Sequence, residues 1–478
     1  MRYLLASILG ATAGLSFQLQ LPLIVVFPTL IMMFLLTFSV NRRGWILLWN
    51  LYALLQFVLG LRWLDIVGFD IVLVVSIFCL TSFLAATIIT SFVIDQTQRI
   101  LWFVLSLTLC ENIRDSFPFG GFGWLQYGMI LVDTPLFVLH RVLPQLLVTL
   151  LVLAVSAFIA LVLLNKISRP RLVGISLSLT AIIALSYINF IQLDSTRTFN
   201  VIAVQGGVER YGLGVLGNRT EVLQNHIAVT ETNITSVNMA DVVLWPENSL
   251  DIDPSIEPRA AELIEVIDTV VVPPILLGSV LSPTSTTRSN TTIELNEGVR
   301  EIYTKQRLVP FGEFLPFRDF ASRLTDRVDL LPYDFISGTT PGIWKRGNLQ
   351  LSVGICFEVA DTSIIHQGIE NSDAVVIQTN NATYQFSNQS EQQLLYAKIR
   401  SIETGRPLIS ISTSGVSALI SEGDILKSIE KGQTGVISFD IGNYSGKTIT
   451  TLLSPMAGWI VFALWLAMFI YILREKSR

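Results

Sequence analysis

The chain has few charged residues, few histidines and few cysteines, and each shortage excludes a class of protein. Only 14% of its 478 residues are charged, against about 25% in an ordinary soluble domain, which indicates a bilayer. The three histidines, His140, His226 and His366, lie in no motif, and no residues have the spacing of metal ligands. There is also no glycine-rich phosphate loop and no serine nucleophile elbow. We therefore expect neither a metal ion nor a cofactor.

The three cysteines predict no disulfide framework. Cys79 and Cys110 lie in apolar segments, whereas Cys356 lies in the polar part of the chain. A lone cysteine at the end of a strand is most often a small buried apolar residue. A catalytic interpretation of Cys356 therefore depends on the residues that accompany it.

Apolar residues concentrate before Gln192 and after Leu453, and this division predicts three parts. Residues 1–191 are expected to form a transmembrane helical bundle, residues 192–453 a soluble domain large enough to bury its own core, and residues 454–478 a last span with a short tail. Residues 192–453 contain 19 Lys and Arg against 30 Asp and Glu, a net charge of −11, while the remainder has a net charge of +6. An acidic domain without a basic stripe argues against nucleic acid as a partner.

Eight apolar runs approach the roughly 17–25 residues that a membrane-spanning helix needs. They cover about 3–18, 20–40, 44–63, 70–94, 97–113, 144–165, 171–191 and 454–473. Residues 1–18 could instead be a signal peptide, because Arg2 precedes an apolar stretch. With the N-terminus in the cytoplasm, the inner segments hold ten Lys and Arg and the short outer loops hold three. This bias predicts a multi-pass protein of the cell membrane, with both termini cytoplasmic and residues 192–453 extracytoplasmic, or periplasmic where an outer membrane exists.

The outer segment 114–143 is rich in aromatic residues and glycine but too interrupted to span the membrane. Aromatic rings are favoured at the membrane interface. Two interpretations stay open at this point: a packed loop, or a lip that handles lipid.

Short β-rich runs alternate with helical patterns from Phe199 onward. Several of the runs are continuously apolar, as in strands buried on both faces, and the alternation predicts a layered α/β fold. The expected strands are 201–205, 241–245, 275–280, 302–309, 351–355, 374–378, 408–412 and 435–440, and the expected helices include 218–236, 258–268, 359–370 and 388–404.

Three chemically suitable residues lie in or just after predicted strands, where α/β folds usually place their sites. Glu247 ends the segment Asp241–Glu247, Lys305 lies in the strand predicted at 302–309, and Cys356 follows the strand predicted at 351–355. A cysteine thiolate can hold an acyl group, a carboxylate can take the thiol proton, and an ammonium group can stabilise an oxyanion. Each residue alone is a weak signal, but together they form a complete acyl-transfer set. A pair of Cys356 with His366 remains the alternative.

The motifs around these residues resemble those of the carbon–nitrogen hydrolase (nitrilase) superfamily, and more closely those of the apolipoprotein N-acyltransferase family. The resemblance rests on Trp245-Pro-Glu247, on Lys305 followed by Leu308-Val-Pro-Phe-Gly-Glu313, and on Gly354-Ile-Cys-Phe-Glu358. Phe122-Gly-Trp-Leu-Gln126 and Glu403-Thr-Gly-Arg-Pro407 also fit, whereas Thr379–Phe386 matches only loosely. The order of multiple spans, nitrilase-like domain and final span is similar as well.

The resemblance implies a four-layer α-β-β-α sandwich attached to a membrane bundle. It implies Glu247 as general base, Lys305 as oxyanion stabiliser and Cys356 as nucleophile, with Glu313 and Glu358 in support. Phe357 departs from the family, which often has tyrosine after the nucleophile, so a hydroxyl group is missing there.

The implied reaction moves an acyl chain from a membrane phospholipid through a cysteine thioester to the α-amino group of a diacylglyceryl-modified apolipoprotein. Apolar residues near Phe311, Phe314, Leu315 and Phe317 are candidates to line the site, although an ordinary core is an equally good interpretation of them. The alternatives are a membrane-tethered amidase or hydrolase with the same triad and, in another class, a non-catalytic binding protein.

Overall fold

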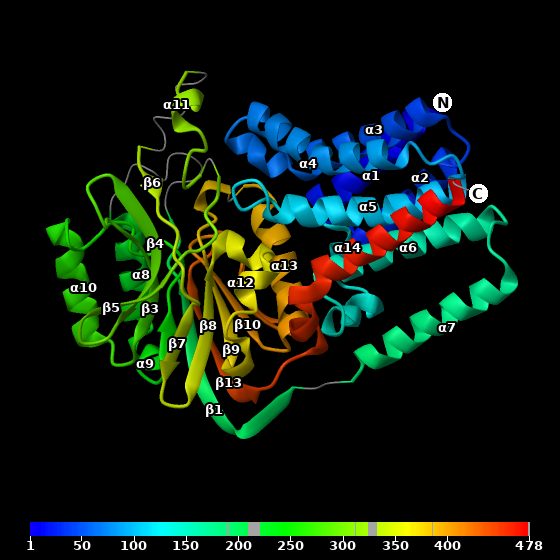
Figure 1. The fold of residues 1–478 in the computed structure, drawn as a ribbon. Helices are drawn as coiled ribbons and strands as arrows, with labels where there is room; N and C mark the ends of the chain where they lie inside the picture. The colour runs from blue at the N-terminus through cyan, green and yellow to red at the C-terminus, as the bar shows by residue number, and fades with distance from the viewer. Residues whose placement is uncertain (189–190, 209–219, 311, 324–331, 385, 477–478) are drawn as a thin grey trace. The chain divides into compact units, whose positions relative to one another are not determined.

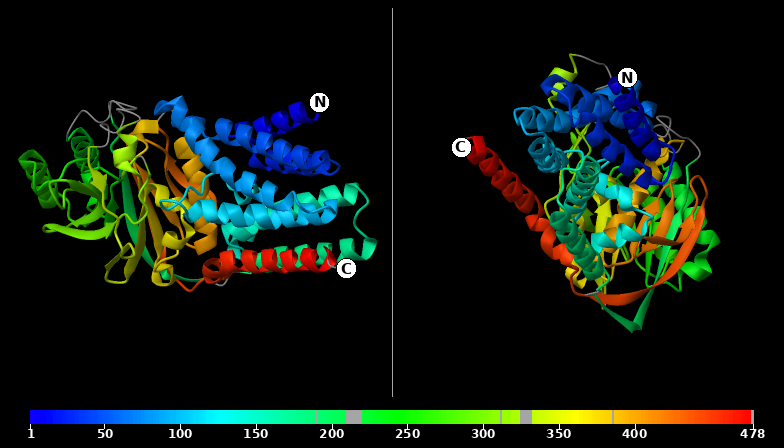
Figure 2. Two further views of the ribbon diagram at one scale, coloured as in Figure 1. Left: turned by 45° about the horizontal axis from the view of Figure 1, so that its top comes forward. Right: turned by 90° about the vertical axis from the view of Figure 1, so that its right-hand side faces the viewer.

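The computed structural model describes residues 1–188, 191–208, 220–310, 312–323, 332–384 and 386–476. The chain forms two compact units, one of Met1–Phe190 with Thr448–Arg478 and one of Ile191–Lys447. Figures 1 and 2 show helices in the first unit and two β-sheets with flanking helices in the second.

The helical unit contains eight helices of 12 or more residues among the described residues, one in each of the eight predicted apolar runs. They are α1 (Arg2–Gln18), α2 (Val26–Thr37), α3 (Arg42–Gly60), α4 (Phe69–Thr90), α5 (Gln96–Ser116), α6 (Gln145–Leu163), α7 (Arg169–Ser186) and α14 (Ile449–Lys476). By length and composition, α4, α6, α7 and α14 are able to cross a membrane. That all eight do so stays a prediction.

Aromatic rings fill the interior of the helical unit. Trp45 and Phe103 meet edge to face at 5.2 Å between ring centroids, and Phe34 and Trp49 do so at 5.0 Å. The helices α1 and α3 approach closely at Gly10, where an added Cβ would lie 2.2 Å from the carbonyl oxygen of Tyr52. Close packing of this kind holds membrane helices together, since lipid tails remove the hydrophobic driving force.

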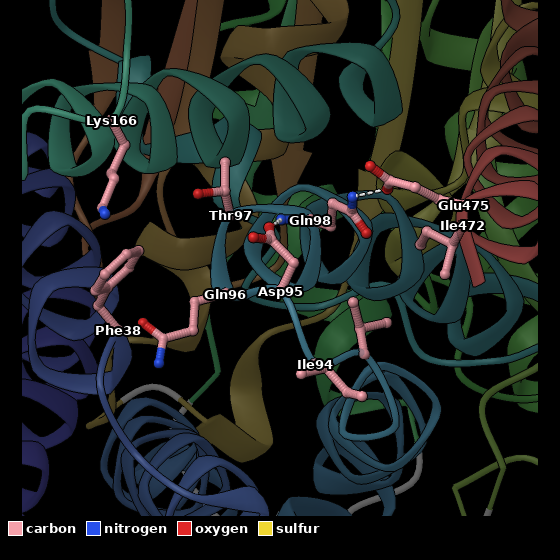
Figure 3. A pocket seen from close by; sticks show the side chains of 10 residues that line it. Phe38, Ile94, Asp95, Gln96, Thr97, Gln98, Lys166, Ile472 and Glu475 are labelled. Atoms are coloured by element: carbon pink, nitrogen blue, oxygen red, sulfur yellow. Dashed lines mark hydrogen bonds between the residues drawn. The ribbon is translucent and has the colours of Figure 1, made fainter. Parts of the chain in front are cut away.

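A cleft of about 570 Å³ lies at one end of the helical unit. Figure 3 shows its lining side chains, which come from the segments that follow α2 and α6, from the end of α14, and from the α4–α5 connection with the start of α5. In the cleft the Gln98 side chain donates a hydrogen bond to the Glu475 carboxylate. The first helix, α1, begins at this end of the bundle, and the last helix, α14, ends there (Figure 1). This is the arrangement expected when an even number of helices cross the bundle in alternating directions.

The aromatic segment after α5 is packed in its second half and exposed in its first. Trp124 is buried beside Trp63, with ring centroids 5.8 Å apart, and the Arg114 guanidinium donates a hydrogen bond to the Trp124 carbonyl oxygen at 3.1 Å. Phe117 is 69% exposed and Phe119 is 43% exposed. The two 3₁₀ turns that follow are η3 (Tyr127–Leu131) and η4 (Pro135–Arg141).

The α/β unit is built on two sheets. The first has the order β13-β1-β2-β3-β4-β5, with β6 beside β4, and the second has the order β12-β11-β10-β9-β8-β7. The strands are β1 (Gln192–Gln205), β2 (Val242–Leu244), β3 (Ile275–Leu281), β4 (Thr287–Leu295), β5 (Val299–Thr304), β6 (Asp334–Phe335), β7 (Ile343–Arg346), β8 (Leu349–Ile355), β9 (Ala374–Thr379), β10 (Leu408–Ser412), β11 (Ser417–Ser421), β12 (Asp424–Ile429) and β13 (Gly435–Ser445). In each sheet three central strands are parallel, β1-β2-β3 and β8-β9-β10.

Two hydrophobic cores fill the spaces between the layers. One core lies between the sheets and joins Val201 and Leu244 of the first sheet to Leu351 and Val376 of the second. The other packs the first sheet against helices α8 (Glu221–Thr232) and α10 (Pro258–Val270).

The opposite face carries α13 (Gln389–Thr404) and the short α12 (Thr362–Ile365), which contact the second sheet (Figure 1). The remaining short helices are α9 (Ile234–Val237) and α11 (Arg318–Ala321). The order helix, sheet, sheet, helix confirms the predicted four-layer α-β-β-α sandwich.

Several of the predicted boundaries are wrong: β1 begins at Gln192 and β13 ends at Ser445, so both strands are longer than expected. The strand expected at 302–309 ends at Thr304, because the chain leaves the sheet at Lys305. The helix expected at 218–236 begins at Glu221 and is divided at Asn233 into α8 and α9; residues 218 and 219 lie outside the described part. The helix expected at 359–370 is broken into short pieces, with only Thr362–Ile365 in α-helix between the ends of two 3₁₀ turns.

Candidate active site

The three predicted catalytic residues follow three strands and meet within the α/β unit. Glu247 comes after β2, Lys305 directly after β5, and Cys356 directly after β8, which belongs to the other sheet. Lys305 Nζ lies 3.6 Å from Glu247 Oε1, and the Cys356 thiol lies close enough to the Glu247 carboxylate for that carboxylate to raise the pKa of the thiol. Two facing sheets thus place a carboxylate, an ammonium group and a thiol together.

The backbone at Cys356 turns sharply from β8 into the 3₁₀ turn η7 (Cys356–Ala360). Cys356 has a φ of +53°, a left-handed conformation that a residue with a Cβ adopts at an energetic cost. The turn is closed by Glu358, whose Oε2 accepts a hydrogen bond of 2.8 Å from the Ile355 N–H. The strain is therefore held at the residue that carries the thiol.

Glu358 also fixes the chain that follows Lys305. Its Oε1 accepts hydrogen bonds from the Gln306 N–H at 2.7 Å, from the Arg307 N–H at 2.9 Å and from the Tyr303 hydroxyl at 2.8 Å. Burial raises the pKa of Glu358 to about 7, against the opposing effect of the N–H donors and Lys305. The buried Glu358 side chain thus connects the sharp turn at Cys356, called the elbow below, with the segment that carries Lys305.

Lys305 is held by two carboxylates. Its side chain is 1% exposed, and Nζ donates to Glu313 Oε1 at 2.8 Å. Burial alone would lower the pKa of Lys305, but the negative charges of Glu313 and Glu247 outweigh burial and raise the pKa above its usual value. The side chain is therefore a permanent positive charge beside the thiol.

Glu247 is buried and accepts hydrogen bonds on both oxygens. Oε1 accepts from Asn290 Nδ2 at 2.7 Å, and Oε2 accepts from the Asn380 N–H at 2.8 Å. Burial raises the pKa of Glu247 while the charge of Lys305 lowers it, and burial prevails. Burial and the adjacent Glu247 carboxylate likewise raise the pKa of the Cys356 thiol. Glu247 therefore has both the contact and the raised proton affinity of a general base for this thiol.

Asn290 is a site residue that sequence analysis missed. Its amide also donates to Glu313 Oε1 at 3.0 Å, so one side chain bridges the two carboxylates. It lies in β4, inside the polar run Ser289-Asn-Thr-Thr292. That run carries none of the apolar signals by which a strand is recognised, so no signal for Asn290 was available.

The other predicted residues are placed as follows. Phe357 is partly buried in the turn after Cys356. Phe314 and Leu315 are partly buried, Phe317 is 74% exposed, and Phe311 lies outside the described residues. Ordinary core packing is thus excluded for Phe317.

The alternative pair of Cys356 with His366 finds no support. His366 Nε2 faces Glu403 Oε2 at 3.6 Å, whereas the described partners of the Cys356 sulfur are Glu247 and Gln393. Among the residues that the structure describes, no three His, Cys, Asp or Glu side chains are grouped to hold a metal ion.

Comparison with known families gives a match over the helical unit. Residues 9–158 match the model of the apolipoprotein N-acyltransferase N-terminal domain.

Relatives of that name match longer parts of the chain. The apolipoprotein N-acyltransferase of Mycolicibacterium smegmatis is 34% identical over 46% of this chain, and the alignment spans 39% of that protein's length. The one from Vibrio parahaemolyticus is 24% identical over 98% of this chain and 96% of its own. The one from Aquifex aeolicus is 28% identical over 70% of this chain and 74% of its own.

Among solved structures, an amidase of the nitrilase superfamily from Nesterenkonia AN1 covers 54% of this chain and 95% of its own, with 12% identity and a TM-score of 0.39. A carbon–nitrogen hydrolase superfamily protein from Xanthomonas campestris covers 55% of this chain and 96% of its own, with 15% identity and a TM-score of 0.37.

Proposed function

We propose that the chain, which resembles apolipoprotein N-acyltransferases over most of its length, transfers a fatty acyl chain from a membrane phospholipid to the α-amino group of a diacylglyceryl-modified apolipoprotein. Glu247, Lys305 and Cys356 carry the reaction. The observation that supports these roles most directly is the buried cluster in which Glu247 contacts both the Lys305 ammonium group and the Cys356 thiol.

In the first step, Glu247 takes the thiol proton and the Cys356 sulfur attacks the ester carbonyl of the phospholipid. A carbon–sulfur bond forms and the ester carbon–oxygen bond breaks. The proton held by Glu247 passes to the departing oxygen, so a lysophospholipid leaves as an alcohol. Lys305 faces the negative charge that develops on the carbonyl oxygen.

In the second step, the neutral α-amino group of the acceptor attacks the thioester carbonyl. The carbon–nitrogen bond forms, the carbon–sulfur bond breaks, and Glu247 moves one amine proton to the Cys356 sulfur. Water would give a free fatty acid in place of the amide, so an acyltransferase must exclude water from this site. The low exposure of Lys305 and Glu247, 1% and 6% of their side chains, supports a dry site.

The protein is a multi-pass membrane protein with apolar helices. We propose that both termini face the cytoplasm and that the α/β unit faces outward. The support is the excess of Lys and Arg in the segments assigned to the inside and the common end of the bundle at which α1 begins and α14 ends (Figure 2). Both substrates are lipid-anchored, so a membrane-bound enzyme can find them by lateral diffusion.

The test uses the purified full-length chain in detergent with a phospholipid carrying a labelled acyl chain. We expect label on Cys356 and then, after addition of a diacylglyceryl peptide, label on the peptide's amine. Cys356→Ala should carry no label, and the matched control Cys110→Ala should behave as wild type. Release of free fatty acid alone, with the peptide present, would assign the chain to the hydrolases. An acyl-enzyme in Cys356→Ala would overturn the assignment of the nucleophile.

A further inference from the structure

The Cys356 sulfur has a second polar neighbour, on the helix that covers the second sheet. Gln393, on α13, is 4% exposed, and its Nε2 lies 3.8 Å from Cys356 Sγ. An amide has a donor end and an acceptor end of nearly the same shape. Which end faces the sulfur therefore decides whether Gln393 favours or opposes a negative charge there.

Hydrogen bonds at the far end of the side chain determine that orientation. Gln393 Oε1 accepts from Asn381 Nδ2 at 2.8 Å and from Gln389 Nε2 at 3.4 Å. A reversed amide would turn its N–H groups toward these two donors, in a buried place where an unsatisfied donor is costly. The nitrogen of Gln393 therefore faces the sulfur.

The orientation of Asn381 is fixed in turn by a backbone group. The Gly415 N–H donates to Ser412 Oγ at 2.8 Å, which leaves the Ser412 hydroxyl hydrogen free to donate to Asn381 Oδ1 at 2.7 Å. A backbone N–H cannot exchange its donor role. In the chain of hydrogen bonds from Gly415 through Ser412 and Asn381 to Gln393, each group donates to the next, and the last N–H faces the sulfur.

We propose that Gln393 is a further functional residue of the acyl-transfer site, whose side-chain N–H holds the Cys356 sulfur and stabilises it as the thiolate. Asn381 and Ser412 are the positioning residues that keep this N–H pointed at the sulfur. The catalytic meaning of this role rests on the proposed function, in which Cys356 is the nucleophile. Gln393 gains and loses no proton, because the thiol proton goes to Glu247.

The donor has an effect at two points of the reaction. A hydrogen bond to the charged form of a group favours that form, so Gln393 offsets part of the penalty that burial and the Glu247 carboxylate impose on the thiolate. The same N–H faces the sulfur when the thioester breaks and the thiolate leaves. Glu247 thus removes the thiol proton, and Gln393 stabilises the negative charge that remains on the Cys356 sulfur.

The test measures the thiolate directly, with iodoacetamide on the purified full-length chain in detergent. Alkylation is followed by mass spectrometry of the peptide that contains Cys356, so Cys79 and Cys110 do not contribute. We expect Gln393→Leu to be alkylated about tenfold more slowly than wild type at each pH below the thiol pKa, which corresponds to about one pKa unit. Gln393→His should return toward the wild-type rate, because imidazole offers one acceptor nitrogen and one donor N–H. Equal rates for Gln393→Leu and wild type would overturn the proposal.

A second variant changes the other end of the chain of hydrogen bonds and leaves Gln393 in place. A Cβ at position 415 would come within 2.6 Å of Asn381 Oδ1 and 2.8 Å of Ser412 Oγ, so Gly415→Ala displaces both. We expect it to slow alkylation in the same direction as Gln393→Leu, whereas Gly174→Ala, which meets nothing within 4 Å, should not. Wild-type alkylation in a folded Gly415→Ala would contradict the positioning role. Alkylation needs no lipid substrate, so its result can be interpreted even if the acyl-transfer assay fails. Failure of this proposal and failure of the proposed function can therefore be distinguished.

Discussion

The exchange of Glu358 for glutamine tests how far the site depends on one buried carboxylate outside the three residues proposed as catalytic. Glu358 accepts four hydrogen bonds, three on Oε1 and one on Oε2. Glutamine has the same shape but only one acceptor oxygen. That oxygen can satisfy the three donors at Oε1, but the amide nitrogen then faces the Ile355 N–H, and one buried backbone donor loses its partner.

The expected loss of stability follows from the one buried donor that is left without a partner. One buried donor without a partner costs about 1–3 kcal/mol, which lowers the melting temperature by roughly 2–12 °C for a domain of this size. The Ile355 N–H directly precedes Cys356, so the elbow should also lose its fixed geometry. Because a displacement of about 1 Å can cost about a hundredfold in rate, we expect Glu358→Gln to form acyl-enzyme at least tenfold more slowly.

The assay pairs Glu358→Gln with Glu370→Gln. Glu370 lies in the same unit and makes an exposed ion pair with Lys447 at 2.7 Å, which is worth no more than about 1 kcal/mol. Thermal unfolding and acyl-enzyme formation are measured for both variants and for wild type. If Glu358→Gln melts within about 1 °C of wild type and is acylated at the wild-type rate, the four hydrogen bonds do not hold the site together and this reasoning fails.

Three further changes test the remaining parts of the site. Lys305→Met should lower the rate of acyl-enzyme formation about 10²–10³-fold, as loss of an oxyanion-stabilising group does; a smaller loss than tenfold would remove Lys305 from that role. Activity needs ionised Glu247, whose pKa burial raises, so the acidic limb of the pH–rate profile should lie above the usual glutamate range. Asn290→Leu removes a donor to that carboxylate and should move the limb about one further unit to higher pH, and an unmoved limb would show that Glu247 does not set it. Gly278→Ala would place a Cβ 2.5 Å from the Glu247 Cα, and we expect about a hundredfold loss of rate beside an unaffected Gly174→Ala.

The fold could be predicted because its central strands are continuous apolar runs. The segments around Val243, Leu351 and Val376 contain few polar residues, and they became buried parallel strands. Glu247 and Cys356 follow such strands within three positions, so their strand ends were visible in the sequence. Lys305 follows β5, a largely exposed antiparallel strand whose end the sequence placed too late. The eight apolar helices were visible for the same reason.

The polar parts of the fold could not be predicted. Strand β4 (Thr287–Leu295) contains Ser289, Asn290 and Thr291, yet nearly all of it is buried. Polar residues are stable there because several find partners far along the chain, as Thr292 does in donating to Gln378 across the two sheets. Local patterns do not contain information about partners 86 residues apart.

Two contacts of the site were hidden in the same way. The Asn380 N–H binds Glu247, and Asn381 holds the amide of Gln393. Both asparagines lie in the segment Thr379–Phe386, in which the resemblance to the family is weakest. The segment supplies a backbone donor and a local hydrogen-bond network, functions that many different sequences can fulfil.

The unequal positions of two carboxylates explain why Glu247 and not Glu313 is the proposed base. Glu313 Oε1 lies 2.8 Å from Lys305 Nζ and its Oε2 accepts from the Val309 N–H at 2.8 Å, so the charge of Glu313 is taken up by the lysine and the backbone. Glu247 lies farther from the ammonium group, at 3.6 Å, and it contacts the thiol. A proton accepted by Glu247 therefore weakens only the longer of the two ion pairs of Lys305, whereas a proton on Glu313 would remove its closest counter-charge. With Glu313 retained as the anchor, Lys305 keeps its position and charge throughout both steps, and of the two carboxylates only Glu247 changes its protonation state.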